Sequence, residues 1–239
     1  MLDTLQNYVE DHPPQRSPDE VLKALHKISQ REKTDGYIPN PFIEVMRSMA
    51  KLWIKKANSK CRCIIVTGEP NAGKTRLARY CNNIFYSVEM VQSQSKFNQS
   101  LTEGKIKPQI VIFDEAHMNS LFNKHRRYDT KKFFEGNGMC WEEKGKSPGS
   151  LFKDCVCLIT AQYLHPVLEP PVEEALINEG QIDSRVKKSS NDQLDYNAFE
   201  ERTKKFYFGR RYDVEDKFPF TIEEFAATLL DMSQKEEPL

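Results

Sequence analysis

The stretch that decides the fold reads Gly68-Glu69-Pro70-Asn71-Ala72-Gly73-Lys74-Thr75. It matches in full the pattern G-x-x-x-x-G-K-[ST] of a phosphate-binding loop. The apolar run from Cys63 to Thr67 precedes it and predicts a buried parallel strand, and Arg76-Leu77-Ala78-Arg79-Tyr80 can open a helix. In that setting the glycines let backbone N–H groups face a β-phosphate, and the helix N-terminus adds positive partial charge. The sequence therefore predicts an α/β core in which residues 68–76 bind a nucleotide.

The chemistry of this motif assigns further roles. Lys74 is expected to bridge the β- and γ-phosphates of ATP, and Thr75 to ligate Mg²⁺. A second apolar run, Ile110 to Phe113, ends in Asp114-Glu115. A carboxylate at the carboxyl end of a buried strand lies beside the phosphate loop, so Asp114 is expected to hold Mg²⁺ and Glu115 to polarise the attacking water.

A third apolar run, residues 155–160, ends in Thr160-Ala161-Gln162. Gln162 has two interpretations that the residues alone leave open. Its amide orients the hydrolytic water and senses the γ-phosphate, or it is an ordinary turn residue. Buried strands that alternate with longer polar or helical stretches predict a three-layer core with a mainly parallel central sheet.

The remaining chain divides into segments. Residues 1–16 have little apolar periodicity and are expected to be a flexible lead-in. Residues 17–57 predict a small helical segment, with a capping box at Ser17 and a second helix start at Asn40-Pro41. The ATPase core is expected over residues 58–235, and it ends in a strand at 205–208 and a helix at 221–232 capped by Thr221.

Composition limits the class of protein. The 239 residues carry 35 basic and 35 acidic side chains and are 38% hydrophobic, which favours a folded chain with a modest core. No apolar run is long enough to span a membrane, and no signal peptide is recognisable, so a soluble intracellular protein is expected. The pairs Cys61/Cys63 and Cys155/Cys157 have the wrong spacing for zinc and are expected to be reduced core thiols.

Charge is distributed unevenly along the neutral chain. Residues 124–153 hold eight bases against four acids, whereas residues 213–239 hold eight acids against two bases. Such a distribution is compatible with polyanion binding on one face. The bases Arg126, Arg127, Lys131 and Lys132 equally fit a solvated helix face, and both interpretations stay open.

Taken in order, these motifs resemble a superfamily 3 viral replication helicase of the AAA+ type. The likeness is closest to the motor domain of parvoviral Rep and non-structural proteins, and it covers roughly residues 61–232. It rests on the phosphate loop, the acidic pair, the tip at Gln162, the segment 131–138 with Lys144-Gly145-Lys146, and the segment 201–208. The family's third motif usually ends in Asn where this chain has Gln162.

The resemblance implies a motor that moves on single-stranded DNA and unwinds duplex during genome replication. It implies that Lys144 and Lys146 contact DNA from a hairpin, and that Arg202 is an arginine finger inserted into the ATP site of a neighbouring subunit. It further implies a homo-oligomeric ring, which in this family is usually a hexamer, with the N-terminal helices as an oligomerisation segment. If the protein is viral, the host nucleus is the expected compartment.

The chain lacks the His-hydrophobe-His triplet of the nicking domain that often precedes such motors, so an origin-binding or nicking protein is expected to act in trans. Two other function classes fit part of the pattern. One is an ATPase that serves as an assembly or packaging factor, or that acts on RNA. The other is a kinase with a phosphate-binding loop, against which the lysine-bearing segment and Arg202 argue.

Overall fold

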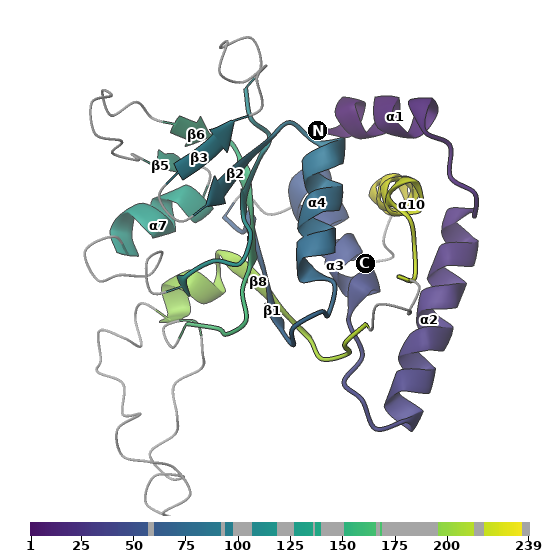
Figure 1. The fold of residues 1–239 in the computed structure, drawn as a ribbon. Coiled ribbons are helices and arrows are strands. Elements are labelled where there is room, and N and C mark those ends of the chain that lie inside the picture. Colours follow the sequence, from purple (N-terminus) through teal and green to yellow (C-terminus); the bar gives the residue numbers. More distant parts are fainter. Residues whose placement is uncertain are drawn as a thin grey trace, which may run out of the picture.

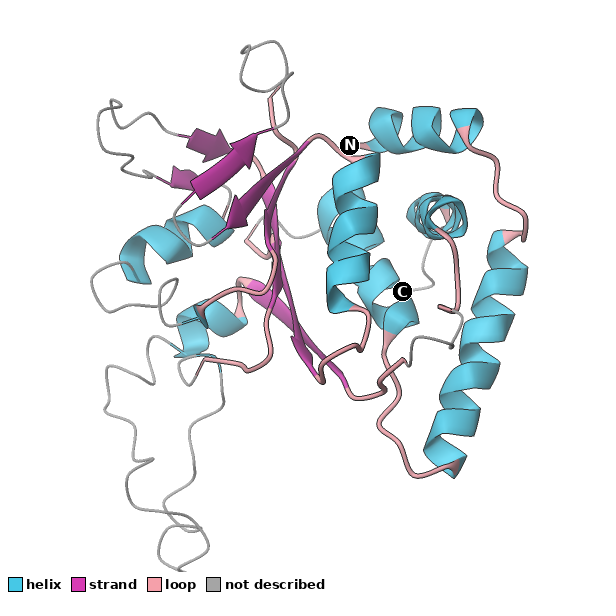
Figure 2. Cartoon of the chain, viewed as in Figure 1, coloured by secondary structure: helices cyan, strands magenta, loops and turns pink. Residues whose placement is uncertain are grey.

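The computed structural model describes residues 1–56, 60–91, 94–97, 107–118, 127–135, 137–139, 151–165, 168, 196–212 and 218–235. Over these residues the chain forms an α/β structure with a central sheet between two helical layers, as the sequence predicts (Figures 1 and 2). No helix among the described residues is sufficiently long and apolar to span a membrane.

The central sheet has six strands in the order β3-β2-β4-β7-β1-β8. Their bounds are β1 (Cys63–Gly68), β2 (Ser87–Val91), β3 (Gln94–Phe97), β4 (Ile110–Phe113), β7 (Val156–Thr160) and β8 (Thr203–Phe208). Every neighbouring pair is parallel except β2 and β3. The expected strands at 63–67, 110–113, 155–160 and 205–208 are confirmed, and β7 lies between the strand of the phosphate loop and the strand of the acidic pair.

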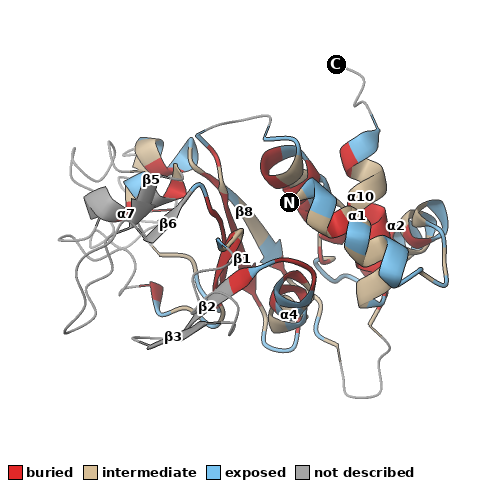
Figure 3. Ribbon diagram, turned by 90° about the horizontal axis from the view of Figure 1, so that it is seen from above, coloured by how far each residue is buried: buried red, intermediate tan, exposed pale blue. Residues whose placement is uncertain are grey.

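Side chains of β1 alternate between two hydrophobic clusters because successive residues of a strand point to opposite faces. Ile64 and Val66 belong to one cluster, and Cys63 and Ile65 belong to the other. Both sets are buried, which explains why the strand reads as a continuous apolar run rather than an alternating one. Figure 3 shows buried residues along the central strands and on the sides of the helices that face them.

Helices cover both faces of the sheet. On one face lie α1 (Leu2–Asp11), α2 (Pro18–Thr34), α3 (Phe42–Met49), a π-helical turn η1 (Ala50–Ile54), α4 (Lys74–Ile84) and α10 (Ile222–Gln234). On the other face lie α7 (Arg127–Phe134) and a helical turn at residues 196–200. There Phe134 packs edge-on against Phe199, with ring centroids 6.0 Å apart.

The N-terminal region differs from expectation in two respects. Residues 1–16, expected to be a flexible lead-in, contain α1, whose Leu5 is fully buried against the helical layer. Leu2, Leu5 and Val9 recur at helical spacing over a stretch too short for the pattern to be decisive in the sequence. The expected boundary at residue 57 does not divide the protein into two hydrophobic cores. Residues from α1 to α3 pack in the same hydrophobic cluster as residues of α4, α10 and β1.

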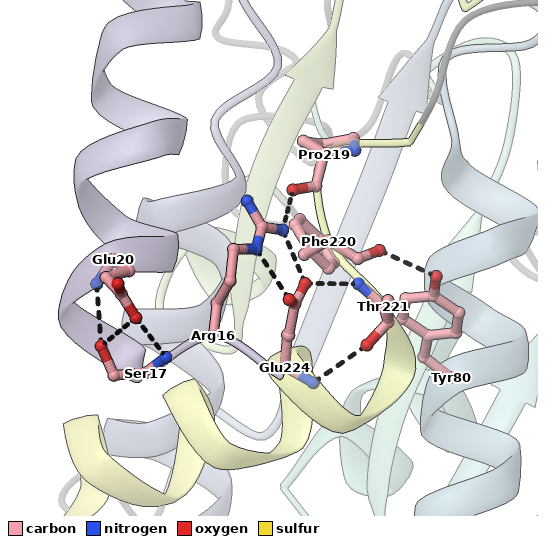
Figure 4. Close-up of polar contacts among 8 residues, drawn as sticks. All are labelled: Arg16, Ser17, Glu20, Tyr80, Pro219, Phe220, Thr221 and Glu224. Atoms are coloured by element: carbon pink, nitrogen blue, oxygen red, sulfur yellow. Dashed lines mark hydrogen bonds and ion pairs between the residues drawn. The ribbon is translucent and has the colours of Figure 1, made fainter. Parts of the chain in front are cut away.

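An ion pair between a partly exposed arginine and a buried glutamate joins the start of the chain to the last helix (Figure 4). The guanidinium of Arg16 donates to both carboxylate oxygens of Glu224, at 2.7 and 2.6 Å, and to the carbonyl of Pro219 at 2.8 Å. Glu224 also completes the predicted capping box with Thr221. Its side chain is only 3% exposed, so Arg16 supplies the charge that a buried carboxylate needs.

A second, two-stranded sheet pairs β5 (Asn137–Met139) with β6 (Leu151–Lys153) in antiparallel register. Lys144 and Lys146, the residues expected to contact DNA, lie between these strands in sequence and fall outside the described residues. Arg126 falls outside them as well. Lys131 is described, and its ammonium lies 5.5 Å from the centroid of the Phe199 ring.

Candidate functional site

The phosphate loop is shaped by three residues with positive φ. Gly68 has φ +130°, Asn71 has φ +60° and Gly73 has φ +93°. A Cβ added at Gly68 would lie 2.1 Å from the carbonyl oxygen of Phe208, so only glycine fits where β1 turns out of the sheet beside β8. A Cβ at Gly73 would meet the ring of Phe218 at 2.5 Å. Gly68 is therefore required by backbone conformation and by space, and Gly73 by its backbone conformation.

The loop is held on its outer side by two distant chain segments, which we call the loop brace (Asn40, Phe208, Arg210 and Tyr212). The N–H of Glu69 donates to the carbonyl of Phe208 at 2.8 Å, and the N–H of Tyr212 donates to the carbonyl of Asn71 at 3.0 Å. The brace thus fixes the backbone at both ends of the curl.

Asn40 links the loop to Arg210. Its amide nitrogen donates to the carbonyls of Ala72 and Arg210, at 3.0 and 2.9 Å, and its oxygen accepts from the N–H of Arg210 at 2.9 Å. The sequence interpretation of Asn40 as part of a helix start is incomplete. Pro41 is the N-cap of α3 and makes no side-chain cap bond, while the side chain of Asn40 is buried against the loop instead.

Lys74 begins α4 and turns back into the loop. Its ammonium donates to the carbonyls of Gly68 and Glu69, at 2.8 and 2.6 Å. Burial lowers the pKa of Lys74, and the carboxylates of Glu69, Glu115 and Asp114 oppose that change. Among the described residues no side chain caps the N-terminus of α4, whose first N–H groups have no partner within the helix. Ammonium and helix terminus together favour an anion at this position.

The acidic pair reaches the loop as the sequence predicts. The hydroxyl of Thr75 donates to Oδ1 of Asp114 at 3.2 Å. The hydroxyl of Thr160, at the end of β7, donates to the same oxygen at 2.5 Å and accepts from the N–H of Glu115 at 2.9 Å. Thr160 was not identified as a site residue from the sequence, where it was only the end of an apolar run. It is positioned by the parallel pairing of β7 with both β1 and β4.

Glu115 and Gln162 line one pocket with the loop. This pocket has a volume of about 500 Å³ and is lined by Pro70 to Arg76, Glu115, Thr160, Ala161, Gln162, Tyr212 and Phe218. Glu115 has φ +51°, a left-handed conformation that turns the chain sharply after Asp114. Both Glu115 and Gln162 are exposed, so their side chains are accessible to a ligand or to water.

Glu69 is directed away from this pocket. Its carboxylate accepts from Nε of Arg211 at 3.0 Å and from the hydroxyl of Tyr207 at 3.2 Å. These hydrogen bonds, that of Arg211 first, lower the pKa of Glu69. Glu69 therefore contributes its backbone carbonyl to Lys74 and its side chain to the segment after β8.

Arg202 lies at the amino end of β8, opposite to the phosphate loop. β8 runs parallel to β1, and the loop follows the carboxyl end of β1. The guanidinium of Arg202 donates to Oε1 of Glu135, with Nε at 2.8 Å, and to the carbonyl of Ala198. The structure therefore does not bring Arg202 to the pocket of its own chain.

The residues present fit a magnesium–nucleotide complex. The described residues include no cluster of three or more His, Cys, Asp or Glu side chains able to hold a metal ion. Mg²⁺ usually needs only one or two protein carboxylates, with substrate phosphates and water as the other ligands. The adjacent oxygens of Thr75 and Asp114 meet that requirement.

The cysteines of the described residues are buried and free, as expected of core thiols. Burial raises the pKa of Cys81 and of Cys155 to about 12. Thiols with such pKa values stay protonated at neutral pH and are poor nucleophiles.

Fold and site together define an α/β protein in which a loop with the complete G-x-x-x-x-G-K-[ST] pattern faces an acidic strand end. No family model matches the chain, and no curated protein matches it. Among solved structures, it aligns with two described as the A form apo structure of the NrS-1 C-terminal region. The first has a TM-score of 0.41 and 14% identity over 92% of this chain and 44% of that one, and the second has 0.44 and 15% over 91% and 46%. This chain spans less than half the length of either.

Proposed function

We propose that this chain is an ATP-hydrolysing motor of the superfamily 3 helicase type, acting on single-stranded DNA. The observation that carries the proposal is the contact between the hydroxyl of Thr75, which lines the loop pocket, and the carboxylate of Asp114, 3.2 Å apart. These two groups belong to segments 39 residues apart and meet where a nucleotide-bound Mg²⁺ needs oxygen ligands.

Each group in the pocket has a role in hydrolysis. The N–H groups at the start of α4 and the ammonium of Lys74 bind the phosphates. Thr75 and Asp114 would hold Mg²⁺, which would supply charge neutralisation to the nucleotide phosphates. Glu115 accepts a proton from the attacking water, and the amide of Gln162 orients that water. Thr160 positions both acids by bonding the side chain of Asp114 and the N–H of Glu115.

Arg202 has a role only between subunits. Because it lies at the amino end of β8, it is too far along the sheet to serve its own pocket. In a ring, the neighbouring subunit would bring its Arg202 to the γ-phosphate, where an arginine stabilises the transition state by a factor of about 10³–10⁵. In that arrangement the guanidinium of Arg202 would have to leave its ion pair with Glu135 and bind the γ-phosphate instead.

The first experiment measures ATP hydrolysis with and without single-stranded DNA. We expect Lys74→Ala to lose hydrolysis by at least about 100-fold, since it removes the charge that binds the phosphates. Lys27→Ala, on the exposed side of α2, is the matched control and should hydrolyse ATP like the wild type. A Lys74→Ala protein with unchanged turnover would refute the nucleotide site.

DNA dependence separates the motor from the other function classes. Stimulation of hydrolysis by single-stranded DNA is expected of a helicase, and stimulation by RNA alone would assign an RNA-directed ATPase. A rate unaffected by either would favour an assembly or packaging factor. Transfer of phosphate to a small acceptor, instead of its release, would identify a kinase.

The second experiment tests Arg202 from both sides of its ion pair. Arg202→Ala should bind ATP but fail to hydrolyse it, and mixing it with Lys74→Ala subunits should restore part of the activity. Glu135→Gln breaks the same pair yet keeps the arginine, so it should retain hydrolysis. If Glu135→Gln loses activity as Arg202→Ala does, the pair is only structural.

A further inference from the structure

The segment from Val45 to Gly68 is unusually basic. It contains six bases and no acid, namely Arg47, Lys51, Lys55, Lys56, Lys60 and Arg62. The described side chains of its four lysines are all exposed. Four of the six bases, Lys55, Lys56, Lys60 and Arg62, lie in the chain between η1 and β1. Arg62 directly precedes β1 and is therefore at the amino end of that strand, opposite to the phosphate loop.

A pocket of about 280 Å³ lies at these amino ends. Its walls come from the end of η1 and from the residues that precede β1, β4 and β7. The residues relevant to its chemistry are Leu52, Lys56, Arg62, Lys107, Asp154 and Val156. The strands are about 20 Å long at 3.3 Å per residue, so this pocket and the loop pocket are separated by the length of the sheet.

The charge of the pocket is positive. Lys56, Arg62 and Lys107 contribute three cations, and Asp154 is the acid among the lining residues. Asp154 is 71% exposed and lies 3.8 Å from Nη1 of Arg62, which is an ion pair but too long for a hydrogen bond. Nη1 of Arg62 is buried and has no hydrogen-bond partner within the described part of the chain. A buried guanidinium donor without an acceptor is costly, and an anionic oxygen would satisfy it.

The remainder of the pocket is apolar and larger than one phosphate group requires. Leu52 and Val156 are buried and form part of its wall. The volume equals about nine waters at roughly 30 Å³ each, which suits a phosphate with an attached sugar. Lys51, Lys55 and Lys60 are exposed and belong to the same basic segment as Lys56 and Arg62. The ammonium of Lys55 donates to the carbonyl of Lys235 at 2.7 Å, and that of Lys60 lies 3.8 Å from Glu201. A pocket for one sugar–phosphate unit that shares two cations with such a basic segment matches a single strand of linked phosphates better than an isolated anion.

We propose that the pocket formed by Lys56, Arg62 and Lys107 at the amino ends of β1, β4 and β7 binds the phosphodiester backbone of single-stranded nucleic acid. Lys56 and Lys107 contact phosphates at the entrance, and Arg62 donates from the wall. This site includes neither Lys144 nor Lys146, which the helicase resemblance implies as DNA contacts, and it requires no ATP hydrolysis.

The test measures binding of a fluorescein-labelled 20-nucleotide oligo(dT) to the full chain by anisotropy, without nucleotide, over a range of salt concentrations. Lys56→Gln/Lys107→Gln should weaken binding about tenfold near 0.1 M salt. The slope of log K against log salt should become shallower by about 1.4, because each lost phosphate contact on a single strand removes about 0.7. Lys23→Gln/Lys27→Gln on α2 removes the same charge elsewhere and should leave both quantities unchanged.

Several outcomes would overturn the proposal: no binding of the oligonucleotide by the wild type, an unchanged slope in the first variant, or an equal loss in the α2 control. Pyrophosphate tests whether the pocket instead binds a small phosphorylated molecule. In that case pyrophosphate should displace the oligonucleotide from the wild type more strongly than NaCl does at equal ionic strength. The same displacement should be absent in Lys56→Gln/Lys107→Gln.

Basal ATP hydrolysis of Lys56→Gln/Lys107→Gln should equal that of the wild type. The motor function is tested by ATP hydrolysis in Lys74→Ala, and the pocket is tested by oligonucleotide binding in Lys56→Gln/Lys107→Gln. The two proposals can therefore succeed or fail separately.

Discussion

At the scale of single residues, Asn40 illustrates how a side chain far from the motif controls it. Asn40→Asp keeps the shape but places a carboxylate oxygen against the carbonyls of Ala72 and Arg210, where an amide now donates. A buried polar group left without its partner costs about 1–3 kcal/mol, and more when it is charged. We expect the free energy of unfolding to fall by at least that amount and the Kd for ATP to rise, as measured by urea denaturation and nucleotide titration.

Asn7→Asp provides the matched control, because Asn7 is exposed on α1. It should change neither quantity appreciably. If Asn40→Asp lowers stability but leaves ATP affinity unchanged under conditions where the protein is folded, Asn40 supports the fold without positioning the loop.

The pair Arg16–Glu224 gives a prediction about pH. The hydrogen bond from Arg16 lowers the pKa of Glu224 below its usual value of 4.5. The ionised form is therefore stabilised in the folded state, and this stability is present above pH 4.5 and lost as the pH falls through the lowered pKa. Arg16→Ala removes the ionic partner of the buried Glu224 carboxylate. Because Arg16 is itself 39% exposed, the cost should be smaller than for a fully buried pair, about 1–3 kcal/mol at pH 7.

The stability difference between wild type and Arg16→Ala should shrink as the pH falls below 4.5, which thermal or urea unfolding at several pH values would measure. Arg31→Ala removes an exposed pair with Asp35 at 3.7 Å and should cost less than about 1 kcal/mol. A difference between wild type and Arg16→Ala that does not vary with pH would contradict the assigned ion pair.

Much of the candidate site could be predicted from sequence at this scale. The spacing of the sequence motifs predicts the chemical roles of four residues, namely Lys74, Thr75, Asp114 and Glu115. Thr160 and Asn40 could not be found in this way. Their roles depend on which strands are neighbours and on which loop approaches which, and a linear pattern contains neither relation.

At the scale of elements, the pairing of β1 with β8 at its carboxyl end requires that residue 68 has no side chain. Gly68→Ala would place a Cβ 2.1 Å from the carbonyl oxygen of Phe208, and the backbone cannot yield without breaking the pairing of β1 with β8. We expect loss of ATP binding together with a fall in Tm. Gly36→Ala is the matched control, since Gly36 has φ +81° but no heavy atom within 4 Å of the added Cβ.

Gly36→Ala should cost only the strain of a left-handed residue, about 1–2 kcal/mol, and keep ATP binding. Equal effects of the two substitutions would show that conformational strain, and not contact with β8, determines the need for glycine at position 68.

Elements were predictable where the local signal was strong. The apolar runs of β1, β4 and β7 are buried on both faces, and the capping boxes at Ser17 and Thr221 mark the starts of α2 and α10. β2 and β3 were not predicted, and α1 was assigned to a flexible segment. A helix of 10 residues with one fully buried side chain depends mainly on tertiary packing, which single-sequence periodicity does not reveal.

At the scale of the whole molecule, the helical layer and the sheet share one core, so damage at the N-terminus should spread. Leu5→Ala removes a fully buried side chain and should destabilise the protein by about 2–5 kcal/mol. Leu2→Ala, at a residue that is 39% exposed, should have a small effect. Urea unfolding can be monitored both by loss of helical structure and by nucleotide release, and the two probes should show the same transition. Separate transitions would mean that α1 belongs to an independent unit.

The loop brace also determines when during synthesis the nucleotide site can form. The loop motif is complete at residue 75, yet β1 needs β7 and β8 as neighbours, and the loop backbone needs Phe208 and Tyr212. A nascent chain that ends before residue 212 has the whole motif and lacks the partners that shape it. ATP capture is therefore expected to begin only after residue 212 has left the ribosome.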